Sequence, residues 1–151
     1  MASLGFEFAY MLDGKNTTPI YRSFILNAAV ARNVGDLMYQ HTDGDLIHAA
    51  ASQDEVTCVA MENIAAADIT AGTTTIKCAV ITRNQVWKCS MDAATTALLV
   101  GYTKTVDIVD TNTLDADGSA AKGILVDASH LDDDGNVLAH VVFSDTTWGN
   151  A

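Results

Sequence analysis

The sequence is poor in basic residues, and this shortage excludes several classes of partner. Its 151 residues contain 8 Lys and Arg against 19 Asp and Glu, which gives a formal net charge of -11. Such a charge repels phosphate backbones and anionic lipid surfaces, so we expect no nucleic-acid or membrane binding. No apolar run approaches the ~20 residues that cross a bilayer. The first residues also lack the basic start and continuous apolar stretch of a secretory signal.

Cysteine is scarce as well. Cys58, Cys78 and Cys89 are an odd number, they are widely spaced, and they form no CxxC motif. We therefore expect reduced, buried thiols that pack as small hydrophobic side chains, in a protein made in the cytoplasm. A disulfide between two of them is the minor alternative.

Catalytic motifs are missing too. The sequence contains no GxSxG, no HExxH and no GxxxxGK[ST] phosphate loop. We expect no enzymatic activity, no catalytic residues, no cofactor, no metal and no small-molecule substrate. Trp87 and Trp148 could stack on sugars, but a tryptophan within a strand is more often part of the core.

The sequence does have short segments of alternating apolar and polar residues, separated by turn residues. This period of two is typical of strands with one buried face. We predict a mainly β fold, a small β-barrel or sandwich, in one domain or one domain plus an arm. The expected strands span residues 6–10, 21–26, 36–41, 46–51, 55–61, 73–82, 85–89, 106–110, 123–127 and 137–144.

One short α-helix is predicted after the strand at 85–89. Ser90 is a good N-cap, Asp92 lies in the first turn, and Gly101 can end the helix. The Ala-rich segment 91–100 lies between them. A further short helical turn is expected at 63–68, where three alanines follow one another.

The segment QHTDGDLIH at residues 40–48 brings two histidines and two aspartates together. With Asp43-Gly44 as a two-residue turn, His41 would face Leu46, and Tyr39 would face His48. His41 and His48 would then be diagonal neighbours, but no third ligand is implied, and zinc sites need three or four. We therefore favour a solvated hairpin over a metal site.

Two acidic loops resemble calcium loops only superficially. In 132–136 (DDDGN) the glycine comes too early and no glutamate follows, and 115–119 (DADGS) has the same shortcomings. We interpret both as hairpin turns.

The first 33 residues have a different character. Three of the four phenylalanines occur before residue 25, in segments separated by the turn residues 13–16. We predict two divisions of the chain, an N-terminal arm at 1–33 and a barrel domain at 34–151. The arm would pack on another protein; the open alternative is that its strands complete the same core.

The order of strands and turns resembles the head decoration, or cement, proteins of tailed bacteriophages. The likeness spans about residues 33–144. It rests on a Gly-Asp entering a strand at 33–39, a strand pair at 80–89 before the Ala-rich segment, the segment 105–108, the loop around Gly118, and the strands ending at 123–127 and 141–143.

The resemblance implies a β-barrel on the outside of an icosahedral capsid in the virion, made in the host cytoplasm. Such proteins often form homotrimers and link neighbouring subunits of the major capsid protein. Aromatic and arginine side chains often dominate interfaces. We therefore expect the capsid contact to involve Phe6, Phe8, Tyr10, Tyr21, Arg22 and Phe24.

Two other classes stay open. Tail-tube and head-completion subunits of virions also use small acidic β-barrels. A carbohydrate-binding module or adhesin would use the two tryptophans.

Overall fold

A computed structural model describes residues 5–26, 28–40, 46–48, 55–94, 105–115, 123–144 and 146. Almost all of its regular structure is strand, so the prediction of a mainly β fold is confirmed. The elements are β1 (Glu7–Met11), β2 (Tyr21–Ile25), β3 (Leu37–Gln40), β4 (Leu46–His48), β5 (Cys58–Ala60), the 3-10 turn η1 (Ala66–Asp68), β6 (Thr75–Val80), β7 (Gln85–Ala94), β8 (Thr105–Asp110), β9 (Thr113–Asp115), β10 (Gly123–Leu131) and β11 (Asn136–Phe143).

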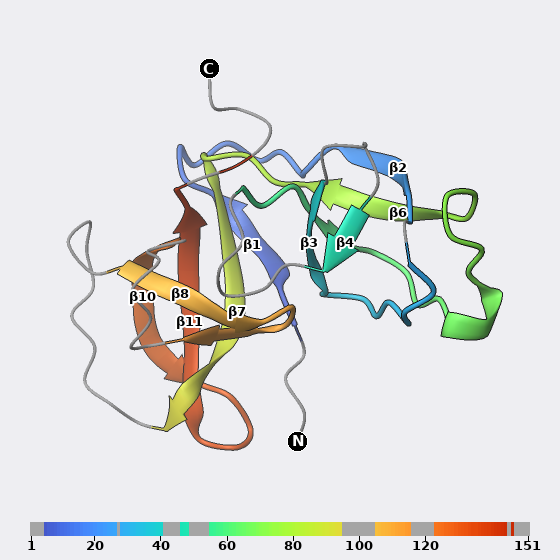
Figure 1. Ribbon diagram of the computed structural model, residues 1–151. Helices are drawn as coiled ribbons and strands as arrows, with labels where there is room; N and C mark the ends of the chain where they lie inside the picture. Colours follow the sequence, from blue (N-terminus) through green and yellow to red (C-terminus); the bar gives the residue numbers. More distant parts are fainter. Residues whose placement is uncertain are drawn as a thin grey trace.

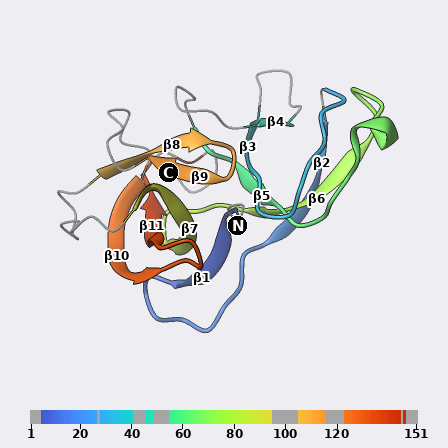
Figure 2. The ribbon, with the colours of Figure 1, turned by 90° about the horizontal axis from the view of Figure 1, so that it is seen from below.

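Five strands from the C-terminal half of the chain close into a barrel (Figure 1, Figure 2). Neighbouring strands follow the order β7-β11-β10-β8-β9, and pairing between Met91 of β7 and Leu114 of β9 closes the ring. Along β11 every second residue is buried, as expected for a strand with one face on a core. The barrel alternative of the prediction is therefore confirmed.

A second sheet, in the order β2-β6-β5-β3-β4, lies beside the barrel (Figure 2). Its strands send side chains into two different clusters. Leu37, Val59 and Ala79 belong to the cluster that fills the barrel, whereas the adjacent Met38 and Cys58 belong to a second cluster on the other face. Burial of both faces explains why these short segments are apolar almost throughout.

The N-terminal segment is not a separate arm in this structure. β1 pairs with β7 at the edge of the barrel sheet, and β2 pairs along its whole length with β6. The backbone N–H of Phe6 donates to the carbonyl of Gly35 at 2.8 Å. These strands complete the two sheets, which is the alternative left open above. The prediction of a boundary at residue 33 itself stays a prediction.

The predicted helix at 91–100 is wrong where the structure describes it. β7 continues as a strand to Ala94, with Ser90 opposite Leu138 and Ala94 opposite Asn136. Pairing with β11 and burial of Met91 outweigh the weak local preference for helix. Residues 95–101 lie outside the described part of the chain. The predicted turn at 63–68 is present as η1.

Both predicted hairpin turns can be compared with the strands around them. Asp132–Asn136 does connect β10 to β11: the Asp132 carboxylate accepts backbone N–H bonds from Asp134 and Asn136, both at 2.9 Å. Between β3 and β4 the observed pairs include Met38 with His48 and Gln40 with Leu46. The predicted register was therefore wrong by one residue. Residues 41–45, with His41, and the loop 116–119 lie outside the described residues.

Candidate functional site

The six residues predicted to contact a partner do not form one surface. Phe6 and Phe24 are only 3% and 8% exposed. Phe6 packs in the barrel cluster, with its ring centroid 5.5 Å from that of Phe143, and Phe24 packs in the second cluster. These two side chains belong to the interior, so the prediction that they meet a partner is corrected.

The other four residues remain at least partly accessible. Phe8 is half-buried and packs edge-on against Trp87, with ring centroids 5.6 Å apart. Tyr10, Tyr21 and Arg22 are exposed. Trp87 itself is 1% exposed, so it is a core residue and offers no face to a sugar; Trp148 lies outside the described residues.

An apolar hollow of about 80 Å³ lies between β1, β2 and the segment before β3. Its lining includes the half-buried Phe8, the buried Pro19, and the exposed Tyr21, Val34 and Met61. We refer to this cavity and these five side chains as the apolar hollow. Its volume is well below the ~300–1,000 Å³ of small-molecule sites. A hollow of this size suits a single anchoring side chain of a protein partner.

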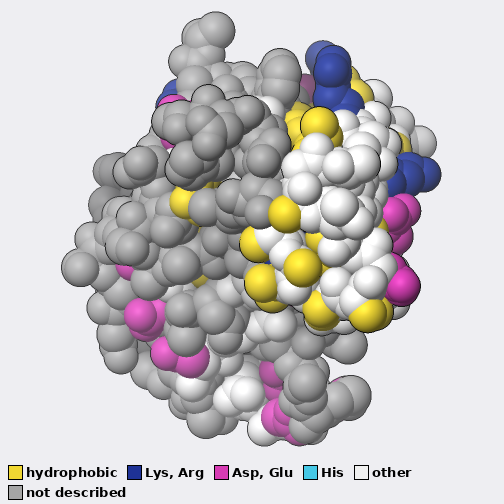
Figure 3. Space-filling model, turned by 45° about the vertical axis from the view of Figure 1, so that its right-hand side comes forward, with side chains coloured by type: hydrophobic (Ala, Val, Ile, Leu, Met, Phe, Trp, Pro, Cys, Tyr) yellow, Lys and Arg dark blue, Asp and Glu magenta, His cyan; other side chains and the backbone are white. Residues whose placement is uncertain are grey.

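The half of the molecule that carries β2, β6 and η1 shows hydrophobic side chains gathered on one face, with charged groups toward the rim (Figure 3). Val34 is 48% exposed and Tyr21 46% exposed. A second hollow of about 300 Å³ is lined by Met11 at the end of β1, by Thr18 and Ile20 before β2, and by residues between 80 and 85. Exposed apolar side chains that gather in one region mark interaction sites more often than isolated ones do.

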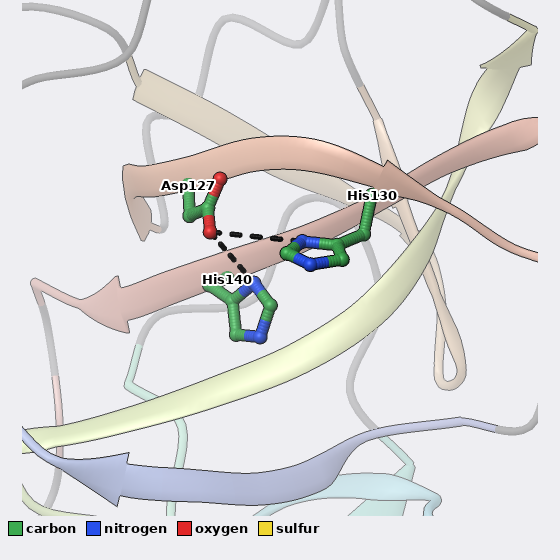
Figure 4. Close-up of side chains that lie close together, drawn as sticks. All are labelled: Asp127, His130 and His140. Atoms are coloured by element: carbon green, nitrogen blue, oxygen red, sulfur yellow. Dashed lines mark ion pairs between the residues drawn. The ribbon is translucent and has the colours of Figure 1, made fainter.

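A cluster of two imidazoles and a carboxylate lies on the barrel hairpin, remote in sequence from the hollow (Figure 4). Asp127 and His130 come from β10, and His140 lies directly opposite Asp127 on β11. The Nδ1 atoms of His130 and His140 lie 3.8 Å and 3.9 Å from the same carboxylate oxygen, Oδ2 of Asp127.

Irregularity of β10 is what brings these groups together. Its register against β11 shifts between Leu125 and Asp127 and again between Asp127 and His130. In a regular strand, residues three apart point to opposite faces, so Asp127 and His130 would be separated. Bulges re-aim side chains in this way.

The environment of the cluster affects its protonation. Burial lowers the pKa of His140, against the opposing effect of the Asp127 charge. Hydrogen bonds from the hydroxyl and backbone of Ser129 lower the pKa of Asp127. The ordinary states at neutral pH are therefore an ionised carboxylate and a neutral His140 imidazole.

Sequence reasoning missed this cluster because it looked for histidines close in sequence, at His41 and His48. A usable signal existed: Asp127 and His130 precede a predicted hairpin turn, and His140 follows it. Strict alternation along the strand would place Asp127 and His130 on opposite faces. Only the observed register shifts bring both side chains to the same face as His140.

Comparisons with known proteins add no relative: the sequence matches no protein-family model, and no curated protein is significantly similar to it. Among the described residues, no helix has the length and apolar character needed to cross a membrane.

Proposed function

We propose that this chain is a decoration protein that binds the outer surface of an assembled viral capsid. It links neighbouring subunits of the major capsid protein as part of the virion, and it acts as a homotrimer. A protein that binds the assembled lattice better than the free subunits stabilises the lattice by mass action. The proposal starts from the resemblance of residues 33–144 to phage decoration proteins.

The observation that best supports a binding role is the apolar hollow. Tyr21, Val34 and Met61 are large, exposed and apolar on a chain whose net charge is -11. Burying such side chains releases water and favours association, while the surrounding charge keeps the free protein soluble. An aromatic or aliphatic side chain of the capsid subunit is the expected occupant.

Strand edges offer a second mode of contact. β1 begins the strand order of the barrel sheet, and β2 begins that of the second sheet. An edge strand can accept a further strand from a neighbouring polypeptide, with main-chain hydrogen bonds supplying affinity. The N-terminal strands would then contribute an edge to the capsid contact while remaining part of their own sheets.

A pelleting experiment tests the proposal. Undecorated heads of the virus that encodes this chain are mixed with the purified protein, and in parallel the protein is mixed with unassembled capsid subunits. We expect the protein to pellet with heads, to leave free subunits unbound, and to raise the temperature at which heads disrupt.

Two variants of matched exposure locate the contact. Val34→Asp places a charge at the hollow and should weaken head binding about tenfold or more, because the carboxylate must lose its water. Leu131→Asp changes a residue that is 51% exposed at the end of β10 and should bind as the unaltered protein does.

The same preparations distinguish the competing classes. Sedimentation should give a trimer. Assembly of the purified chain into tubes, or into rings of six or twelve, would instead favour a tail-tube or head-completion subunit. Failure to bind heads at any concentration at which the protein stays soluble would reject the decoration role.

A further inference from the structure

We propose that Asp127, His130 and His140 form a binding site for a divalent transition-metal ion, with zinc as the best-suited ion. The site is independent of the decoration role and lies on a different part of the chain from the apolar hollow. Two imidazoles and one carboxylate are ligands that zinc accepts readily, with a water molecule to complete four-coordination.

The spacing of the donor atoms is close to what a metal requires. One ligand atom from each residue lies within 4.8 Å of the other two, and two of the separations are 3.8 Å and 3.9 Å. Ligands around a tetrahedral zinc, at 2.0–2.1 Å from it, are about 3.3 Å apart. The side chain of His130 is 65% exposed, so rotation of this ring can close the remaining gap without disturbing the core.

The carboxylate is already held in a ligating orientation. Its Oδ1 accepts hydrogen bonds from the backbone N–H of Ser129 at 2.8 Å and from the Ser129 hydroxyl at 2.7 Å. Both bonds leave Oδ2 directed at the two imidazoles (Figure 4). In metal sites, the side chains that coordinate the ion are regularly held in orientation by hydrogen bonds from neighbouring residues.

The second supporting observation is the Nδ1 atom of His140. It is buried, and it has no hydrogen-bond partner. A buried polar atom left unsatisfied costs free energy, and coordination of a metal ion would satisfy it. The atom faces Asp127 Oδ2 across 3.9 Å, too far for a hydrogen bond, and a metal between the two would satisfy both.

Two neighbouring groups oppose metal binding, one by its positive charge and one by a competing hydrogen bond. Lys88 lies opposite His140 on β7, but its ammonium lies 3.5 Å from the carboxylate of Glu7, which offsets its charge. Ser129 Oγ lies 3.1 Å from Nδ1 of His130 and can accept a hydrogen bond from the Nδ1–H tautomer of that ring, because the hydroxyl donates its own hydrogen to Asp127. Metal binding replaces that contact while Ser129 keeps its bonds to Asp127.

A bound ion would join β10 to β11 across the irregular part of β10. The register shifts leave this region with an interrupted ladder of backbone hydrogen bonds. A ligand that binds only the folded state raises stability by mass action, so we expect zinc to stabilise the barrel hairpin.

Isothermal titration calorimetry of the untagged protein with zinc chloride tests the site. We expect one equivalent to bind and the unfolding temperature to rise with zinc concentration. His130→Ala and Asp127→Asn should each weaken binding about tenfold or more. Ser129 is not a proposed ligand, yet Ser129→Ala should weaken zinc binding about tenfold, because the Asp127 carboxylate loses the hydrogen bond from the Ser129 hydroxyl.

His48→Ala is the matched control, since it removes an imidazole from β4 in the other sheet. It should bind zinc as the unaltered protein does. Long-range proton–nitrogen NMR provides a second readout: zinc should perturb Nδ1 of His130 and His140 and leave the proton on Nε2. No saturable binding, or binding that the His130 and Asp127 variants leave unchanged, would overturn the proposal.

Discussion

Replacing Phe6 by alanine tests whether the N-terminal segment packs in the core of its own chain or is available to contact a partner. The ring is 3% exposed and packs against Phe143 inside the barrel cluster. Truncating a buried phenylalanine costs about 3–5 kcal/mol, because transfer free energy is lost and a cavity remains. Domains of this size have about 5–15 kcal/mol of stability in total, so the variant should lose about a fifth of it or more.

Equilibrium unfolding in urea, followed by circular dichroism and tryptophan fluorescence, measures this loss. A thermal scan should show a decrease in unfolding temperature of roughly 6–20 °C, at about 2–4 °C per kcal/mol for a chain of this length. Tyr21→Ala is the control, since Tyr21 is 46% exposed and should cost less than about 1 kcal/mol.

Similar stabilities of the two variants would refute the reasoning. If Phe6→Ala cost no more than Tyr21→Ala, the Phe6 ring would not lie in the barrel core. The N-terminal segment would then be free to act as an arm, as the sequence alone suggested.

Three further outcomes follow from the packing. Gly5→Ala should destabilise more than Gly14→Ala: both have φ near +75°, but only at Gly5 would a Cβ meet backbone, 2.7 Å from the Gly35 oxygen. Urea unfolding of both variants measures the difference. Asp132→Ala should cost about 1 kcal/mol by the same assay, because two backbone N–H groups lose their acceptor, whereas the exposed Asp133→Ala should cost little. The three buried cysteines should resist a colorimetric thiol reagent in the folded protein and react fully in denaturant.

The expected resistance to the thiol reagent has a second cause at Cys58, in addition to burial from the reagent. Burial raises the pKa of Cys58 well above its ordinary value, with the neighbouring Cys78 adding to the effect. The reactive thiolate is therefore scarce in the folded state as well as inaccessible. Rapid reaction of the folded protein at neutral pH would show that the second sheet opens easily.

Strand positions were predictable because they depend on local information. The alternation of β11 and the Asp-rich turn before it gave a hairpin that the structure contains, and the burial of Trp87 followed from its place in a strand. Buried cysteines were also expected, and all three cysteines are buried.

The errors occurred where partners distant in sequence decide the conformation. Residues 90–94 have capping and alanine signals for a helix, yet strand pairing with β11 extends β7 through them. Phe6 and Phe24 appeared to be available for a partner because nothing local shows that Phe6 packs against Phe143 in the barrel cluster or that Phe24 packs in the second cluster.

The amino-acid sequence by itself determined that the chain forms strands, carries a large negative charge and buries its cysteines, because composition, period and turn chemistry act over a few residues. Tertiary structure alone decided which aromatic side chains are interior, where the apolar hollow lies, and that Asp127, His130 and His140 meet. The physical reason is register: a shift of one residue in a strand changes the face on which every later side chain lies, and only pairing with the neighbouring strand fixes it.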